Sequence, residues 1–116
     1  TNCLVGSLED MKAHYARLGR RLGIAFGPPE EIVNELAIRY LDTDSAQQAV
    51  AILRYNADQH PESANAWRRL GIGLERGGQR LEALERYRKA VALAERQRLP
   101  NLEMFRQQVA RLATAR

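Results

Sequence analysis

The chain has 116 residues, of which 45% are hydrophobic, and this combination indicates one globular domain with its own core and excludes a disordered chain. No apolar run approaches the roughly 20 residues that a membrane-spanning helix needs, so we expect no membrane contact. The single cysteine, Cys3, excludes an internal disulfide and a cysteine-based metal centre. The first residue is Thr1 and not Met, from which we expect a fragment or a processed form.

The net charge of +4 is unevenly distributed along the chain. Residues 1–58 carry six Lys and Arg against eight Asp and Glu, whereas residues 80–116 carry nine against four. A basic half is one property of nucleic-acid-binding proteins. Here, however, Arg86 and Lys89 are interleaved with Glu82 and Glu85, which is typical of a solvated helix with local ion pairs. We therefore do not expect a nucleic-acid partner.

The first predicted helix covers residues 7–22. Ser7 suits the N-cap position, and Gly23 suits the stop at the other end. Between them, apolar residues recur at alternating spacings of three and four, which is the period of one helix face. These residues are Leu8, Met11, Tyr15, Leu18 and Leu22. Such a narrow stripe is typical of a seam between two helices.

The Gly-Pro-Pro sequence at 27–29 is the strongest break in the first half of the chain. Two helices are predicted after it, at 29–41 and 45–58. Asp44 or Ser45 can cap the second of them. Pro61 follows, so this helix ends before it.

The stretch from residue 63 to residue 90 predicts a further pair of helices, at 63–76 and 79–97, with a Gly-Gly turn between them. Trp67 is the largest residue on the apolar stripe of the first helix. Gly71 lies on the same stripe, where the missing side chain lets a neighbouring helix come close.

The last predicted helix covers residues 101–114, after the break at Pro100. We expect it to cover the open apolar side of the preceding helix, as terminal helices do in repeat arrays. Its apolar residues again alternate at three and four, at Leu102, Phe105, Val109 and Leu112.

Two stretches of the chain repeat with a period of 34 residues. The order Trp, Leu-Gly and then Ala and an aromatic residue in the second helix, together with this period, resembles the tetratricopeptide repeat family. The resemblance implies an all-α fold of about six helices, without strands, in which antiparallel helix pairs stack as a short superhelix. We expect an N-terminal segment with one amphipathic helix at 1–28, repeats at 29–61 and 62–97, and a capping helix at 98–116. The predicted repeat core consists of Val33, Leu36, Ala37, Tyr40, Ala49, Leu53, Trp67, Leu70, Gly71, Leu74, Ala83, Tyr87 and Ala90.

The concave face of such an array is lined by the first helix of each pair. Side chains three or four residues apart, beside the buried stripe, are the candidates for contact with a partner there. The alternative is that they meet only solvent or the neighbouring helix. The candidates are Glu31, Asn34, Ile38, Asn65, Arg68 and Ile72.

No motif in the sequence indicates catalysis, a metal or a cofactor. The serines lie outside any Gly-x-Ser-x-Gly elbow, and neither His14 nor His60 has a second zinc ligand at helical spacing. The glycines at 71, 73 and 77–78 lack the strand and the Gly-Lys-Ser/Thr of a phosphate-binding loop. We therefore predict that this chain is not an enzyme and has no metal site and no cofactor.

A narrower resemblance depends on four short segments, at 8–18, 28–30, 34–36 and 61–65. Their order resembles the C-terminal tail of some bacterial α/β-hydrolase esterases that are related to siderophore esterases. This resemblance implies a non-catalytic protein-interaction module, in the bacterial cytoplasm or periplasm, that docks on its own catalytic domain or on another subunit. The alternative is a free-standing adaptor that binds a peptide in the concave groove.

Two repeats are fewer than such arrays usually need for stability. We therefore expect self-association as a two-fold dimer, with the helix at 8–22 at or near the contact. The alternative is a monomer in which this helix folds back onto Val33 and Leu36.

Overall fold

The computed structural model describes residues 8–23, 27–43 and 45–114. Within these ranges it contains six α-helices and no strand, so the predicted all-α fold is confirmed. Every predicted helix is present, with ends within one residue of the prediction where they lie in the described ranges. The proposed caps Ser7 and Asp44 lie outside them. The helices are α1 (Leu8–Leu22), α2 (Glu30–Asp42), α3 (Ala46–Gln59), α4 (Ala64–Arg76), α5 (Arg80–Gln97) and α6 (Leu102–Thr114).

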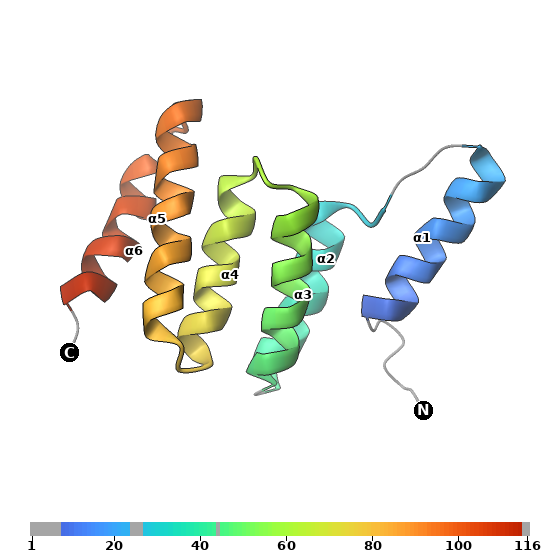
Figure 1. Ribbon diagram of the computed structural model, residues 1–116, viewed down its shortest axis with the longest axis horizontal. Coiled ribbons are helices and arrows are strands. Elements are labelled where there is room, and N and C mark those ends of the chain that lie inside the picture. The colour runs from blue at the N-terminus through green and yellow to red at the C-terminus, as the bar shows by residue number, and fades with distance from the viewer. Residues whose placement is uncertain (1–7, 24–26, 44, 115–116) are drawn as a thin grey trace.

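Helices α2 to α6 stand side by side as a stack, and consecutive helices run in opposite directions (Figure 1). Helix α2 packs against α3, α3 against α4, α4 against α5, and α5 against α6, while α2 also reaches α4. The helix pairs α2–α3 and α4–α5 therefore form successive units of the stack. Helix α1 stands apart at the far end from α6 (Figure 1).

Helix α4 lies in the middle of the stack and carries two glycines that admit its neighbours closely from opposite sides. A Cβ atom at Gly71 would lie 2.8 Å from carbons of the Tyr87 ring, on α5. A Cβ atom at Gly73 would lie 2.9 Å from a methyl carbon of Leu53, on α3. Residues two apart point to nearly opposite sides of a helix with 3.6 residues per turn. The two glycines therefore allow α3 and α5 to approach α4 from its two flanks.

The hydrophobic core is formed by the apolar stripes of the two predicted repeats. Trp67 is 9% exposed, and its indole Nε1 donates a hydrogen bond to the Pro61 carbonyl at 3.0 Å. At the end of the stack, α6 buries Phe105 and Leu112 against α5. Tyr40 is half-buried. The other residues of the predicted repeat core are buried, namely Val33, Leu36, Ala37, Ala49, Leu53, Trp67, Leu70, Gly71, Leu74, Ala83, Tyr87 and Ala90.

The starts of the helices use different capping groups. The Ser63 hydroxyl accepts a hydrogen bond from the Ala66 amide at 3.1 Å, which is the usual N-cap geometry. Ser45 occupies the N-cap of α3 but makes no capping hydrogen bond with its side chain; its carbonyl accepts the first hydrogen bond of the helix, from the Ala49 amide. Pro29 is the N-cap of α2 rather than part of its first turn.

Candidate functional site

A cleft opens between α2 and α4 on one face of the stack, with a volume of about 220 Å³. It is formed where the first helices of the two helix pairs run beside each other above α3. Its walls come from both of these helices, and Leu53 of α3 contributes to its floor. The lining residues are Asn34, Ala37, Ile38, Leu41, Asp42, Leu53, Arg68, Arg69, Ile72 and Arg76.

The middle of the cleft is apolar. Ile38 is 45% exposed, an unusual position for a large aliphatic side chain on a helix that buries its other face. Ile72 faces the cleft from α4 and is half-buried. Beneath them, Ala37 and Leu53 are almost inaccessible to solvent. An aliphatic side chain entering between Ile38 and Ile72 would remove these carbon atoms from water.

Asn34 provides a polar group in the wall of this cleft. Its residue is only 5% exposed, and within the described residues its side-chain amide has no hydrogen-bond partner. Solvent in the cleft reaches this amide, so a bound segment would take the place of water there. The amide can donate and accept at once, so it matches the N–H and C=O groups of a bound backbone.

The α4 side of the cleft is basic. Arg68, Arg69 and Arg76 line it, against the single carboxylate of Asp42. Burial, and secondarily the charge of Arg69, lower the pKa of the Arg68 guanidinium. The Arg68 Nε atom lies 3.4 Å from the Asn65 Oδ1 atom that accepts from it. A carboxylate placed beside Arg68 would stabilise a charge that burial now disfavours.

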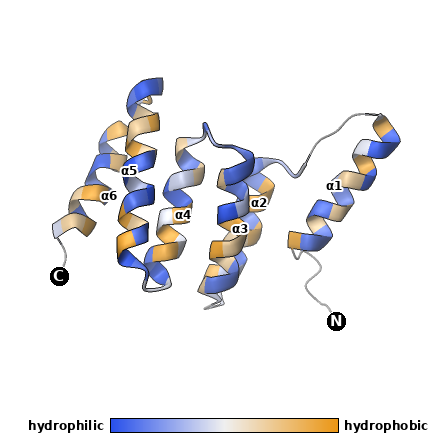
Figure 2. Ribbon diagram, viewed as in Figure 1, coloured by the Kyte–Doolittle hydropathy of each residue, from blue (hydrophilic) through white to orange (hydrophobic). Residues whose placement is uncertain are grey.

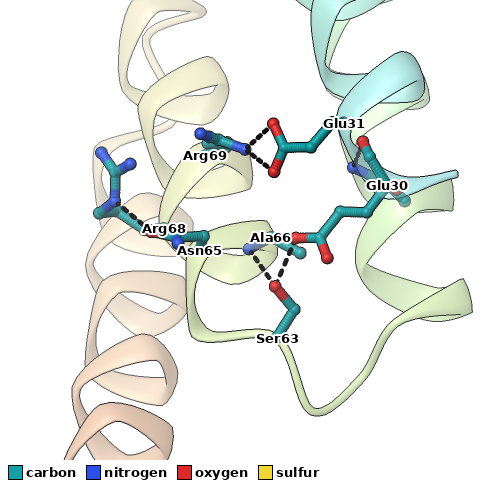
Figure 3. Close-up of polar contacts among 8 residues, drawn as sticks. Glu30, Glu31, Ser63, Asn65, Ala66, Arg68 and Arg69 are labelled. Atoms are coloured by element: carbon teal, nitrogen blue, oxygen red, sulfur yellow. Dashed lines mark hydrogen bonds and ion pairs between the residues drawn. The ribbon is translucent and has the colours of Figure 1, made fainter. Parts of the chain in front are cut away.

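Contacts between α2 and α4 hold the rim of the cleft (Figure 3). A guanidinium nitrogen of Arg69 lies 3.5 Å from both carboxylate oxygens of Glu31, which is itself 70% exposed. Below this pair, the Ser63 hydroxyl donates to the Glu30 carboxylate at 2.5 Å. Glu30 and Ser63 therefore join the start of α2 to the start of α4, which limits how far the cleft can widen at this end.

Four of the six predicted groove residues line the cleft, namely Asn34, Ile38, Arg68 and Ile72. The other two lie beside it: Glu31 pairs with Arg69, and Asn65 accepts from Arg68. These two orient the arginines and do not line the cleft themselves.

Sequence reasoning missed the end of the cleft formed by Leu41, Asp42 and Arg76. A signal for them exists, because the spacing from Arg68 to Ile72 continues to Arg76, and the spacing from Asn34 to Ile38 continues to Leu41 and Asp42. The predicted groove therefore lacked the last helical turn that lines the cleft on each of the two helices.

Among the described residues, no group of three or more His, Cys, Asp or Glu is placed to hold a metal ion. No helix in the described ranges is both long enough and apolar enough to cross a membrane.

The Ser63 hydroxyl is held between the Glu30 carboxylate and the Ala66 amide, which is an arrangement that joins helices.

Comparison with known proteins gives no match, either to a protein family or to a curated protein.

Proposed function

We propose that this chain is a non-catalytic protein-interaction module of the tetratricopeptide kind, and that the cleft between α2 and α4 binds an acidic segment of a partner protein. The observation that carries the proposal is the Asn34 amide, which is nearly buried, faces the cleft and has no partner among the described residues. A bound backbone would offer it hydrogen bonds in place of those to water.

The chemistry of the partner segment follows from the lining. Ile38 and Ile72 favour an aliphatic anchor, because burial of apolar area contributes about 25 cal/mol per Å². Arg68 and Arg76, together with Arg69, which is paired with Glu31 at the rim, outnumber the carboxylate of Asp42 in the lining and favour Asp or Glu on either side of that anchor. The segment we expect is therefore a short extended stretch with one Leu, Ile or Val between acidic residues.

Fluorescence polarisation with labelled peptide pools tests this proposal. One pool places an aliphatic residue between Glu and Asp, a second replaces the acids by Lys, and a third replaces the aliphatic residue by Ser. Only the first pool should bind, and the affinity should fall with rising salt because the arginines at the cleft are partly exposed.

Two variants and a matched control assign the binding to the cleft. Asn34→Ala and Arg68→Ala should each weaken binding about tenfold, which corresponds to about 1.4 kcal/mol. Arg88→Ala changes an exposed arginine on α5, outside the cleft, and should have no effect. Equal binding of all three pools, or loss of binding in the Arg88 variant, would contradict the proposal.

The esterase resemblance supports a related proposal, in which the module belongs to an α/β-hydrolase and docks on its catalytic domain or another subunit. The four segments that carry it lie in α1, at the start of α2, within α2 and in the α3–α4 turn with the start of α4. The coding sequence ahead of Thr1 tests it. A hydrolase domain there would support the relation, whereas a start codon directly ahead of Thr1 would contradict it.

A further inference from the structure

Helix α1 leaves most of its apolar stripe outside the core. The half near its start meets the stack, where Leu8 and Met11 pack against the core cluster, and the Lys12 ammonium lies 5.0 Å from the centre of the Tyr55 ring. In the half near its end, Gly19 is buried, and Tyr15 and Leu18 are half-buried without joining that cluster. Leu22 is 60% exposed. Figure 2 shows hydrophobic segments along a helix that stands apart from the stack.

The charges on α1 are separated along its length. Its first turn is acidic, with Glu9 and Asp10, and its last turn is basic, with Arg20 and Arg21. One flank of the stripe carries this gradient in a single row, since Asp10, His14, Arg17 and Arg21 follow one another at spacings of four, three and four. All four are exposed. The opposite flank contains Lys12, which faces Tyr55 of the stack.

We propose that two copies of this chain associate through their α1 helices, which pair antiparallel about a two-fold axis. This contact is independent of the cleft between α2 and α4. A two-fold axis perpendicular to the helices places the start of one α1 against the end of the other. Asp10 of each copy then lies opposite Arg17 and Arg21 of its partner, while Tyr15, Leu18 and Leu22 fill the seam.

The direction of pairing follows from the charges. A parallel pair would place this row on opposite sides of the two helices, so that Asp10 could not lie opposite Arg17 or Arg21 of the partner. It would also align the two helix dipoles, whereas antiparallel helices bring the positive end of one dipole near the negative end of the other. In a second copy that runs antiparallel, the basic end of α1 lies opposite the acidic end of the first copy, so the charges of the two copies are complementary.

The size of the contact sets the strength we expect. A helix of 15 residues is about 22 Å long at 1.5 Å per residue, and two such helices present only about two heptads to each other. This is a small interface, so association should depend on concentration. Light scattering and sedimentation equilibrium should give the mass of one copy at micromolar concentration and approach that of two copies toward millimolar concentration.

Two charge variants that repel themselves but attract each other test the pairing. In Asp10→Arg, position 10 faces Arg17 and Arg21 of an identical partner, and in the double variant Arg17→Glu and Arg21→Glu it is Asp10 that faces like charges. Each variant alone should self-associate roughly tenfold more weakly than the unaltered chain. An equal mixture should recover a dimer that contains one copy of each, as measured by native mass spectrometry.

Matched control variants distinguish loss of this contact from a general effect of surface charge or surface hydrophobicity. Arg39→Glu reverses an exposed arginine on α2 and should leave self-association unchanged. Leu22→Ser should weaken it, whereas Leu81→Ser, at a residue of α5 that is 76% exposed, should not. Circular dichroism should show that each control variant keeps its helical content.

Three outcomes would overturn the proposal. The first is a mass of one copy at every concentration, the second is a dimer that survives both charge variants, and the third is a mixture of the two variants that remains monomeric. The mixture keeps the test valid if one variant is less helical alone, because pairing with the complementary variant restores the attraction.

Discussion

The ring of Tyr87 lies directly on the backbone of Gly71, so that a Cβ atom added at position 71 would be 2.8 Å from two ring carbons. The ring has little freedom to move away. Its hydroxyl donates to the Glu75 carboxylate at 2.9 Å, and the residue is 1% exposed. One helical turn of α4 therefore holds both the surface beneath the ring and the acceptor of its hydroxyl.

Gly71→Ala should destabilise the fold. Overpacking typically costs about 1–3 kcal/mol, while alanine regains about 1 kcal/mol of helix propensity over glycine. The expected net loss is about 1 kcal/mol in the free energy of unfolding, measured by urea denaturation. Gly77→Ala is the control, because a Cβ atom there meets nothing closer than 3.4 Å. A Gly71→Ala variant as stable as its parent would show that the α5 helix can shift.

Trp67→Ala should be among the most damaging single substitutions. The indole is buried, donates to the Pro61 carbonyl, and has the Lys89 ammonium 5.0 Å from its ring centre. Loss of a buried Trp typically costs about 3–5 kcal/mol, a large part of the roughly 5–15 kcal/mol that stabilises a domain. Thermal unfolding followed by circular dichroism measures the loss, and Leu81→Ala serves as an exposed control. An unchanged melting temperature would contradict the packing described for α4 and α5.

Glu75 should make stability depend on pH on the acid side. Hydrogen bonds from Arg111, at 2.7 and 2.9 Å, are the main cause that lowers the pKa of its carboxyl, and the Tyr87 hydroxyl adds to it. Because the folded pKa lies below the unfolded one, the stabilisation is present above about pH 4.3 and is lost as the pH falls through the folded pKa.

Comparison of Glu75→Gln with the unaltered chain measures this effect. The variant should be less stable near neutral pH by about 0.2–1 kcal/mol, a small value because Arg111 is 55% exposed. The difference should shrink below about pH 4.3. Glu103→Gln, at an exposed residue without an ion pair among the described residues, should show no such change with pH.

The purified chain should hydrolyse no nitrophenyl ester. Ser63 acts in joining helices, so Ser63→Ala should cost about 0.5–2 kcal/mol of stability through the lost cap and leave any background hydrolysis unchanged. Ser45→Ala should be milder, because the Ser45 side chain makes no capping hydrogen bond. Turnover that disappears in either variant would contradict the prediction that this chain is not an enzyme.

The fold could be predicted because each helix carries its own signal. Apolar residues at spacings of three and four place the helices, and glycine and proline end them near residues 27–29, 61, 77–78 and 100. Gly71 even indicated the close approach of another helix. The sequence could not tell which side chain fills that space, since Tyr87 and Ala83 are both on the same face of α5 and only tertiary packing selects the ring.

The placement of α1 and the limits of the cleft were harder to predict. The stripe from Leu8 to Leu22 indicates a buried seam, but periodicity carries no information on whether the covering surface belongs to the same chain. In the cleft, Arg76 and Asp42 are at helix ends, where a periodic pattern stops being informative. Asn34 was identified from spacing alone, whereas the absence of a partner for its amide among the described residues is a property of the folded chain.

The position of α4 between α3 and α5 determines the order in which the helices unfold locally. Helix α4 contacts α3 at Gly73 and α5 at Gly71, so it cannot unfold without exposing both. Helix α6 packs on α5 and reaches α4 through the ion pair between Arg111 and Glu75, and among the described residues α1 joins the core through Leu8 and Met11. Local opening should therefore proceed inward from the two ends. Amide hydrogens in α4 should exchange with deuterium most slowly, those of α6 faster, and those in the second half of α1 fastest of all.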